Sequence, residues 1–589
     1  MEQLPAWNNS TEYQGLDSHD FNTDFSKVTD LVRQIEELSL TKVFDVPRAQ
    51  QISRLYDQAI ILFQNLKAYV GCEMALDAKN EEALKLNSRL LQTASALGAA
   101  ITSSHMYLSR CDDKVLADYL NSPETQPQAF HWQEERKQKD FLLSQEQEEL
   151  LKRFRQFGLQ SWGELYNQIG GSLVVKVQGR GELGLAEAQG LLRDGDEQIR
   201  RDAWQAIQTA WKAFEHPVAA ILNNLAGYRL EEYRRRSHTR PLGFLDRPLT
   251  ESRIERPTLD AMMAAIAEAK PMVERAIKAM AKCHGKERLE PWDLMAPMPR
   301  RSGPPVAYTY AQAREMVTGA FAAVEPAMGE FVSMMIDNGW VDSRVLPNKR
   351  GGAFCTGFAK SRSPRVFQTF LGSFQDISTL AHELGHAWHS WVMRDLPHIQ
   401  REYPMTLAET ASIFAENALA SHILATTKDE SLRHEIAYSE VADAVGLLAN
   451  IPVRFEFEKN FYEARKHGTL SPKELGDLME NAFKNWYGEG LTQAERQFWM
   501  TKLHFSIAGV SFYNYPYSFG YLFSLGVYAQ RDAKGVGFAE TYRNLLRDTG
   551  RMTAEDLVQK HLHLDIRKPD LWRQSLKLIE EKVARLEAL

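Results

Sequence analysis

The sequence predicts a mainly α-helical protein with a small β-sheet beside a metal-binding helix. Apolar residues recur every three or four positions through most of the chain from Asp24 onward, which is the period of an amphipathic helix. Residues 349–374 depart from this pattern, because they are rich in Gly, Phe and Val and contain two strand-like runs. A helical stretch with the motif His-Glu-x-x-His follows them directly. The chain has 589 residues, 44% of them hydrophobic, which is enough to bury a large core.

The elements before this motif are expected to be mostly long helices. Residues 1–25 are polar and are expected to form an extended arm. In chain order we then expect helices at 51–65 and 80–108, a proline-containing loop at 122–128, a highly charged helix at 132–156, a short strand at 173–177, helices between 183 and 281, and a helix at 310–338. The strand-like runs at 352–358 and 365–371 are expected to form the small sheet.

The motif consists of His382, Glu383 and His386. Residues four apart lie on one face of a helix, so the two imidazoles can converge on one metal ion. Glu383 follows the first imidazole, and its carboxylate can reach a water on the same ion, which is the arrangement that a zinc peptidase needs. The alternative for the motif taken alone is a polar helix face.

Several residues around the motif support a helix. Asp376 and Ser378 are good candidates for its N-cap, and Pro397 marks its far end. Gly385 costs helix stability, about 1 kcal/mol relative to Ala. Such a residue inside the motif predicts that another part of the chain packs very close to this face.

A zinc site needs a third protein ligand and an open position for water. In metzincins the third ligand is a His six residues after the motif, and this chain has Val392 at that position. The sequence therefore excludes a metzincin site. The other standard third ligand is a Glu on a second helix.

Three glutamates are candidates for this ligand. Glu402 lies in an expected turn and is poorly positioned. Glu409 and Glu416 are seven apart in the helical run 406–420, so they share one face. We predict that Glu409 is the third ligand and that Glu416 orients a ligand imidazole. The alternative for Glu416 is a solvated surface carboxylate.

Composition and charge argue against several classes of protein. The net charge of −7 argues against a nucleic-acid-binding protein, which usually has a basic excess. The four cysteines are far apart and fit no metal-binding spacing, so we expect reduced thiols in a cytoplasmic protein. The first residues have neither a basic start nor an apolar core, so no signal peptide is expected. No membrane span of ~20 apolar residues is expected either.

Several stretches together resemble one family. They are His382-Glu-Leu-Gly-His-Ala-Trp-His389, Leu407-Ala-Glu-Thr-Ala-Ser412, Lys349-Arg-Gly-Gly-Ala-Phe-Cys-Thr-Gly-Phe358, Phe370-Leu-Gly-Ser-Phe-Gln-Asp-Ile-Ser-Thr-Leu380 and Phe512-Tyr-Asn-Tyr-Pro-Tyr-Ser-Phe-Gly-Tyr-Leu-Phe523. In combination they resemble the oligoendopeptidase F branch of the thimet oligopeptidase-like zinc metallopeptidases.

The resemblance implies a neurolysin-like zincin fold of the gluzincin type, with a deep substrate channel and one Zn²⁺ per chain. It implies an N-terminal arm and helical region at 1–110 and a helical oligopeptidase F N-terminal-type domain at 111–200. The zinc metallopeptidase catalytic domain would then occupy 201–589. The channel would limit the substrates to oligopeptides.

The segment from His504 to Tyr528 is rich in tyrosine. A peptide-bond hydrolase must stabilise an oxyanion, and tyrosine hydroxyls can donate hydrogen bonds to it. The alternative is an aromatic core segment. The resemblance implies that Tyr517 and Tyr521 are the donors. It also implies a His just before the Phe-Tyr pair, where this chain has Ser511, so His504 is the candidate for that role.

Two further groups are expected near the metal. Gly351, Gly352 and Ala353 lie at the start of the strand-like run 352–358, in a region that leads into the metal helix and to which an extended peptide can add as another strand. We therefore expect them to contact the substrate backbone; the alternative is a hairpin without a ligand. His389 is expected to support the ligand set from near His386 rather than to join it.

These features predict a zinc-dependent endopeptidase of oligopeptides that binds neither nucleic acid nor membrane. Glu383 would take a proton from the attacking water and pass it to the leaving amine. Three alternatives remain: a zinc exopeptidase, a thermolysin-type endopeptidase, and a helical interaction protein with a vestigial site. An exopeptidase needs a charged anchor for a substrate terminus, and the basic run at 234–240 is the obvious candidate, although a surface face is its simpler interpretation. The oligomeric state is not predicted.

Overall fold

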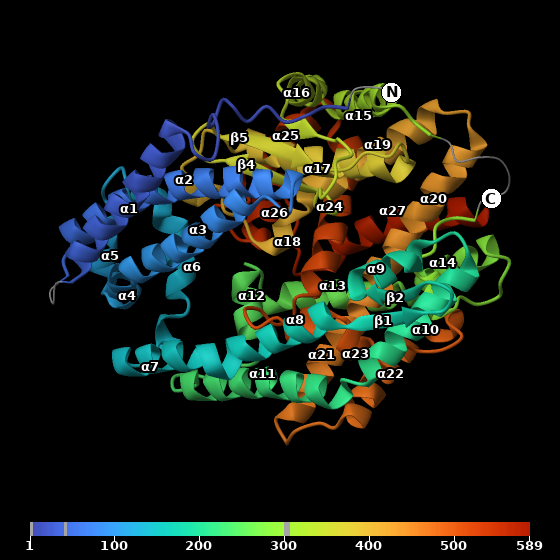
Figure 1. Ribbon diagram of the computed structural model, residues 1–589, viewed down its shortest axis with the longest axis horizontal. Coiled ribbons are helices and arrows are strands. Elements are labelled where there is room, and N and C mark those ends of the chain that lie inside the picture. Colours follow the sequence, from blue (N-terminus) through green and yellow to red (C-terminus); the bar gives the residue numbers. More distant parts are fainter. Residues whose placement is uncertain (1–3, 41–43, 300–306) are drawn as a thin grey trace. The chain divides into compact units, whose positions relative to one another are not determined.

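The computed structural model describes residues 4–40, 44–299 and 307–589, and these are mostly helical (Figure 1). The chain divides into two compact units, each made of three separated segments. Unit 1 comprises Met1–Lys139, Pro304–Thr426 and Gln530–His563, and unit 2 comprises Asp140–Gly303, Thr427–Ala529 and Leu564–Leu589. The predicted mainly α-helical fold with a small β component is confirmed.

Unit 1 combines helices with a three-stranded sheet. Its helices are α1 (His19–Ser39), α2 (Val46–Leu76), α3 (Glu81–Ala100), α4 (Thr102–Arg110), α5 (Asp113–Leu120), α6 (Ala129–Arg136), α15 (Tyr310–Val324), α16 (Pro326–Asp337), α17 (Phe374–Val392), α18 (Met405–Ala408), α19 (Thr410–Thr426), α25 (Phe538–Asp548) and α26 (Ala554–Leu562). Its strands are β3 (Val341–Asp342), β4 (Phe354–Phe358) and β5 (Ser363–Phe367).

The sheet of unit 1 lies against the helix that carries the motif. Its strand order is β3-β5-β4, with β3 parallel and β4 antiparallel to β5. Both β4 and β5 contact α17, and every residue of the central strand β5 is buried. The small sheet predicted beside the helix of the motif is therefore present, although the strands differ by a few residues from the predicted runs 352–358 and 365–371.

In its described residues, unit 2 consists of helices and one β-hairpin, joined by loops. Its helices are α7 (Gln145–Arg155), α8 (Ser161–Ser172), α9 (Leu185–Gly190), α10 (Glu197–Lys212), α11 (Glu215–Arg236), α12 (Asp246–Glu251), α13 (Arg256–Glu268), α14 (Lys270–Cys283), α20 (Glu430–Val445), α21 (Ile451–Arg465), α22 (Pro472–Tyr487), α23 (Phe498–Thr501), α24 (Tyr515–Lys534) and α27 (Asp570–Glu587). The last residues of α24 belong to unit 1. The predicted strand at 173–177 is β1 (Val174–Val177), which pairs with β2 (Gly181–Gly184).

Three predicted helices are each interrupted. The expected helix 132–156 is divided between α6 and α7, because Ser144 and Gln147 form a capping box that begins a new helix. The expected helix 310–338 is divided between α15 and α16 at Pro326, which has no backbone N–H to continue the first helix. The expected helix 80–108 divides into α3 and α4 at Ile101.

The N-terminal arm is less extended than predicted. Its first three residues lie outside the described part of the chain, and α1 already begins at His19. Tyr13 is fully buried against the rings of Phe21 and Tyr69, with centroids 5.2 Å away in both cases. The polar composition of residues 1–25 thus conceals an aromatic residue that anchors the arm to α1 and α2.

One helical run in unit 2 is long and apolar enough to cross a membrane. It extends over Glu430–Arg465, through α20, a short π-helical turn and α21. Of its most apolar window, 61% is buried inside the protein, and the core helices of globular proteins pass the same test. The sequence-based expectation that no stretch reaches such a length and hydropathy does not hold for this run.

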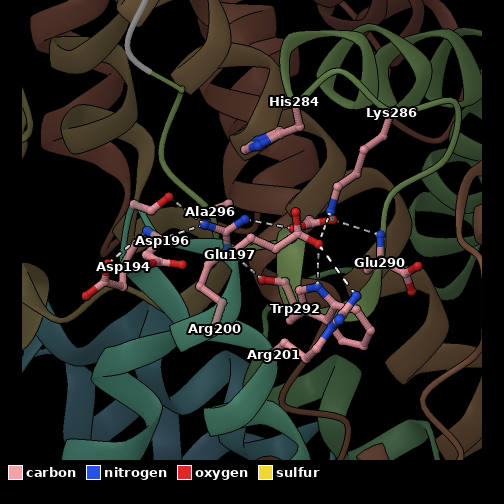
Figure 2. A network of polar contacts seen from close by, with 12 residues as sticks. Asp194, Asp196, Glu197, Arg200, Arg201, His284, Lys286, Glu290, Trp292 and Ala296 are labelled. Atoms are coloured by element: carbon pink, nitrogen blue, oxygen red, sulfur yellow. Dashed lines mark hydrogen bonds and ion pairs between the residues drawn. The ribbon is translucent and has the colours of Figure 1, made fainter.

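A buried ion network fixes α10 to the loop that follows α14 within unit 2 (Figure 2). The Arg200 guanidinium donates to Asp293 Oδ1 at 2.8 Å, and these two side chains are 3% and 0% exposed. Lys286 donates to Asp293 Oδ2 at 2.6 Å and also lies 2.6 Å from Glu197. Both oxygens of the buried carboxylate are thereby paired, as a charge in such a position requires.

Candidate metal centre and active site

Helix α17 presents the two histidines of the motif. It begins at a capping box in which the Ser373 hydroxyl accepts from Asp376 N at 3.1 Å and the Asp376 carboxylate accepts from Ser373 N at 3.0 Å. The predicted cap at Asp376 or Ser378 is therefore wrong by a few residues, because Asp376 is the partner that completes the box. From this start His382 and His386 share one face, and their Nε2 atoms lie 3.2 Å apart.

Glu409 lies at an interruption in the predicted helix 406–420, between α18 and α19. Its Oε2 atom lies 3.5 Å from Nε2 of His382 and 3.5 Å from Nε2 of His386. The Ser412 hydroxyl donates to the same oxygen at 2.6 Å, which fixes the carboxylate. The break thus turns Glu409 toward α17.

The three side chains have the donors and spacing that one metal ion requires. Their ligand atoms all lie within 4.8 Å of one another. Zinc binds nitrogen and oxygen ligands at about 2.0–2.2 Å in a tetrahedron, which separates neighbouring donor atoms by about 3.4 Å. Burial lowers the pKa of His386 to about 4. At His382 burial acts in the same direction, but the hydrogen bond with Glu416 and the charges of the neighbouring carboxylates outweigh it and raise the pKa to about 9. A metal ion would require both imidazoles to be neutral, so its binding would displace a proton from His382.

Two more carboxylates lie beside these ligand atoms. The Nδ1 atom of His382 contacts Glu416 Oε1, which leaves Nε2 directed toward Glu409. Glu383 is 6% exposed, and burial raises its pKa to about 7. Glu416 is therefore in contact with a candidate ligand, and Glu383 is held in a low-dielectric environment on the same helix.

Gly385 allows α17 and α19 to approach closely. A Cβ atom at this position would lie 2.5 Å from the Ala411 carbonyl oxygen and 2.7 Å from Ser412 Cα, distances that side chains do not reach. The predicted close packing against this residue is confirmed. The same approach brings Glu409 and Ser412 next to the histidines.

His389 is fully buried on the same helix. Its ring stacks on Tyr403 with centroids 4.2 Å apart, and its Nε2 atom lies 2.8 Å from the Thr549 hydroxyl and 3.2 Å from the Leu546 carbonyl oxygen. Burial lowers its pKa to about 3, so the ring is neutral. These contacts attach α17 to α25 and to the segment after it.

Residues 351–353 lead into β4, the edge strand of the sheet. The Lys349 ammonium is 3% exposed and donates to Asp342 Oδ1 at 2.8 Å, which fixes the start of this segment. Gly352 has a φ of 87°, a left-handed conformation that favours glycine. The three residues predicted to contact substrate thus form a short exposed or half-buried segment beside an edge strand.

The tyrosine-rich segment belongs to unit 2 and forms its own cluster there. Tyr517 lies on α24 with its hydroxyl 3.4 Å from His504 Nε2. Tyr513 stacks on His504 with centroids 5.7 Å apart and meets the edge of Tyr517. Tyr521, one turn further along α24, is 4% exposed, whereas Tyr513 and Tyr517 are half-buried. The structure therefore groups His504 with Tyr513 and Tyr517, and Tyr521 is the most buried of the four.

Two buried charged residues that were not predicted hold this segment. Arg229 on α11 donates to the carbonyl oxygens of Ile507, Ala508 and Val510 at 2.6–3.1 Å. Its side chain is buried in the same unit. Arg229 also donates to the Tyr462 hydroxyl at 2.9 Å. No local pattern marks this residue, because all of these acceptors are more than 230 positions away along the chain.

Glu458 on α21 holds the other end of the segment. It accepts from Phe512 N at 2.8 Å and from Asn514 Nδ2 at 2.7 Å. Phe512 has a φ of 56°, which is uncommon for a bulky residue and is maintained by this contact. Burial raises the pKa of Glu458 to about 7. The surrounding sequence does not mark this residue, because Glu456 and Lys459 make the stretch 455–461 look like an ordinary amphipathic helix.

Three arginines of the basic run at 234–240 form ion pairs with glutamates of the same unit. Arg234 and Arg235 both pair with Glu231 at 2.7 Å, on the same helix. Arg236 pairs with Glu148 at 2.6 Å and with Glu232 at 3.1 Å. These contacts favour the surface interpretation of the run over an anchor for a substrate terminus.

Comparison with known proteins identifies related sequences along almost the whole chain. The sequence profile of peptidase family M3 matches residues 191–578, and the profile named Oligopeptidase F matches residues 108–174. Oligopeptidase PepF of Bacillus subtilis is 21% identical over 97% of this chain and 85% of its own length. Group B oligopeptidase PepB of Streptococcus agalactiae is 24% identical over 97% of this chain and 96% of its own length.

The fold also matches solved structures. The crystal structure of oligoendopeptidase-F from Enterococcus faecium superposes with a TM-score of 0.70 and 16% sequence identity. The match covers 97% of this chain and 98% of that one. At this identity the likeness concerns the fold, which agrees with the predicted zincin architecture.

Proposed function

The chain belongs to peptidase family M3, and on this premise we propose that it is a zinc-dependent endopeptidase that hydrolyses internal bonds of oligopeptides. Membership of this family, together with oligopeptidase relatives along almost the whole chain, makes it a metalloendopeptidase. The proposal adds the metal, the roles of individual residues and the restriction to oligopeptides.

We propose that His382, His386 and Glu409 hold the ion, one per chain, and that Glu416 orients His382. The convergence of three ligand atoms within 4.8 Å, from α17 and from the break before α19, is the observation that carries this proposal. When bound, zinc would lower the pKa of a water toward about 7 and polarise the scissile carbonyl.

Glu383 is the proposed general base. It accepts a proton from the attacking water and returns it to the leaving amine, so one carboxylate serves both proton transfers. Its position supports this role, because it adjoins His382 on the same helix and is 6% exposed. A buried carboxylate exchanges its proton with the reacting groups in preference to bulk water.

The oxyanion donors are proposed to be Tyr517 or Tyr521, with His504 as a supporting residue. The contact between the Tyr517 hydroxyl and His504 Nε2 at 3.4 Å supports a shared role for these two. The proposed substrate contacts are the backbone groups of residues 351–353, next to an edge strand to which an extended peptide can add. His389 is proposed to support the ligand helix through its contacts with α25 and the residues after it.

The proposed division of the chain is an N-terminal region at 1–110, an oligopeptidase F-type domain at 111–200 and the catalytic domain at 201–589. The positions of the two profile matches support it. A cytoplasmic location is proposed as well, on the grounds that the four cysteines form no disulfide and are widely spaced in the sequence. The net charge of −7 argues against nucleic acid as a partner.

The decisive experiment compares wild type with Glu383→Gln on an end-blocked peptide of moderate length, analysed by mass spectrometry. Wild type should cut internal bonds, and the variant should lose about 10²–10⁴-fold in kcat while its zinc content stays the same. Glu402→Gln is the matched control, because this carboxylate is 54% exposed in the same unit and should be silent.

The same experiment separates the alternatives. Removal of single residues from free peptides, without cleavage of blocked ones, would indicate an exopeptidase. Inertness of zinc-loaded wild type on many peptides would indicate a vestigial site. Cleavage of a folded protein as fast as of a peptide would contradict the restriction to oligopeptides. Full activity of zinc-loaded Glu383→Gln would refute the proposed base.

A further inference from the structure

A second group of metal-ligating side chains lies in unit 1, away from the motif in sequence. It consists of His105 on α4 and of His131 and Glu135 on α6. One ligand atom of each residue lies within 4.8 Å of the others. The helices α4 and α6 are packed against each other, as Figure 1 also indicates.

The donors are those that bind a borderline divalent transition metal. Two imidazoles and one carboxylate form a typical ligand set for Zn²⁺, and imidazole also suits Ni²⁺ and Cu²⁺. The group has the same composition as the set formed by His382, His386 and Glu409. The His105 Nε2 and Glu135 Oε2 atoms lie 3.5 Å apart, which equals both histidine–glutamate distances at the proposed catalytic site.

The scaffold beneath the group is rigid. His131 and Glu135 are four residues apart and so share one face of α6. Between them Trp132 is buried in a core cluster with Leu108 of α4. The rings of both histidines contact Trp132, each with centroids 5.3 Å away. The core therefore fixes the two helices at the separation that brings the donors together.

The placement of the two ring nitrogens of His105 also suits a ligand. Its Nδ1 atom lies 3.4 Å from the Ser109 hydroxyl, one turn later on α4, and its Nε2 atom lies toward Glu135. When the hydroxyl accepts from Nδ1–H, the lone pair of Nε2 is available to a metal. The side chains of His105 and Glu135 are 44% and 43% exposed, so solvent ions have access.

We propose that His105, His131 and Glu135 bind one Zn²⁺ or similar divalent transition-metal ion, in addition to the metal of the peptidase site. The ion bridges α4 and α6 and ties the N-terminal helices of unit 1 together. Because it uses none of the peptidase ligands, this site is independent of the proposed function.

The test is a count of bound zinc. Full-length protein is dialysed to equilibrium against buffered Zn²⁺, and metal per chain is measured by mass spectrometry. Wild type should bind two equivalents and His131→Ala one. His386→Ala should also bind one, and the double variant none. His216→Ala, with a side chain 81% exposed in unit 2, is the matched control and should keep two.

A conservative variant and a thermal measurement distinguish the loss of a metal ligand from misfolding. Glu135→Gln removes only the charge of the carboxylate on the surface of α6, and it should lose the same equivalent while retaining wild-type peptidase activity. Zinc should raise the thermal midpoint of His386→Ala but not that of the double variant His386→Ala/His131→Ala. Two retained equivalents in both His131→Ala and Glu135→Gln, or a single wild-type equivalent that His386→Ala removes, would overturn the proposal. If instead the peptidase motif bound no zinc, wild type would bind one equivalent that His386→Ala retains and His131→Ala loses, so the two failures are distinguishable.

Discussion

Single side chains orient the candidate metal ligands. His382 is held through its Nδ1 atom by Glu416, and Glu409 is held by the Ser412 hydroxyl at 2.6 Å. Two of the three candidate ligands therefore have a protein partner outside the ligand set: His382 at its Nδ1 atom, and Glu409 at the oxygen that faces the histidines. Such partners fix ring orientation and ligand basicity, so they are expected to affect metal affinity almost as strongly as the ligands do.

Glu416→Gln should weaken zinc binding by about 10–100-fold, because a neutral amide supports His382 less well than a carboxylate. The measurement is zinc occupancy during titration with a competing chelator. Glu315→Gln, on an exposed position of α15 in the same unit, is the control and should match wild type. Equal occupancy curves for Glu416→Gln and wild type would mean that this carboxylate is only a surface charge.

At this scale the sequence could identify the residues that act through local spacing. His382 and His386 are four apart on a helix, so their convergence follows from helix geometry. Ser412 and Glu458 could not be identified, because their roles depend on a helix break and on a contact with a residue 54 positions away. Glu409 was selected as a ligand on an incorrect premise, since the predicted helix through it is interrupted.

Among the elements, the contact between α17 and α19 determines the geometry of the proposed metal site. It depends on the absence of a side chain at Gly385. A helical glycine is usually a weakness, since Ala would be favoured by about 1 kcal/mol. At position 385 a glycine is nevertheless required, because the backbone of α19 occupies the space that a Cβ would need.

Gly385→Ala should destabilise the protein by about 1–3 kcal/mol, because a methyl group must displace the backbone of Ala411. Zinc affinity should fall in parallel, as Glu409 moves with α19. Thermal unfolding and chelator titration measure the two effects. Gly71→Ala in α2 is the control, since nothing lies within 4 Å of its added Cβ, and it should stabilise by about 0.5–1 kcal/mol. A neutral Gly385→Ala would contradict the steric argument.

The element that carries the tyrosines depends on a buried carboxylate. Burial raises the pKa of Glu458 to about 7, above its ordinary value near 4.5, so the folded protein binds a proton there more tightly than the unfolded chain does. The contribution of this group to stability is therefore largest near pH 5 and is lost as the pH rises through 7.

Glu458→Gln should remove this pH dependence, because the amide is neutral at every pH. Between pH 5 and 8 the unfolding free energy of wild type should fall relative to the variant by roughly 3 kcal/mol. Thermal midpoints at several pH values provide the measurement. Glu463→Gln, 51% exposed on the same helix, is the control and should follow wild type. Parallel pH profiles for wild type and Glu458→Gln would show that the carboxylate is ionised throughout.

On the scale of the whole molecule, neither unit is a continuous stretch of the chain, because segments of the two units alternate along the sequence. Each unit takes one segment from the early, middle and late parts of the sequence. Hydrophobic periodicity reveals where helices lie, but it does not reveal which helices pack together. The helical class and the sheet beside the metal helix could therefore be predicted, and the composition of the units could not.

A buried charge network gives unit 2 part of its cohesion across distant segments. Asp293→Asn should destabilise it by about 3–5 kcal/mol, because Arg200 would keep its charge in a buried site without an anionic partner. Although burial opposes ionisation, Lys286 and Arg200 hold the pKa of Asp293 below its ordinary value. The difference between wild type and variant should therefore shrink as the pH falls below about 4.

Thermal unfolding of the intact chain over this pH range provides the measurement. Glu197→Gln is the matched control, since this carboxylate pairs with the same Lys286 but is 41% exposed. It should cost less than about 1 kcal/mol. Similar losses in both variants would contradict the assignment of the cost to burial.

Because unit 1 is built from separated segments of the chain, the parts that pack together are synthesised at different times. Phe414 of α19 stacks on Tyr542 of α25 with centroids 4.2 Å apart, and Arg547 pairs with Asp395 just after α17. Both partners on α25 are synthesised more than a hundred residues after the helices that they cover. A ribosome must therefore translate the chain through α25 before the helix of the motif gains this part of its support. Until then the nascent chain carries an uncovered aromatic surface, which is the kind of surface that chaperones bind.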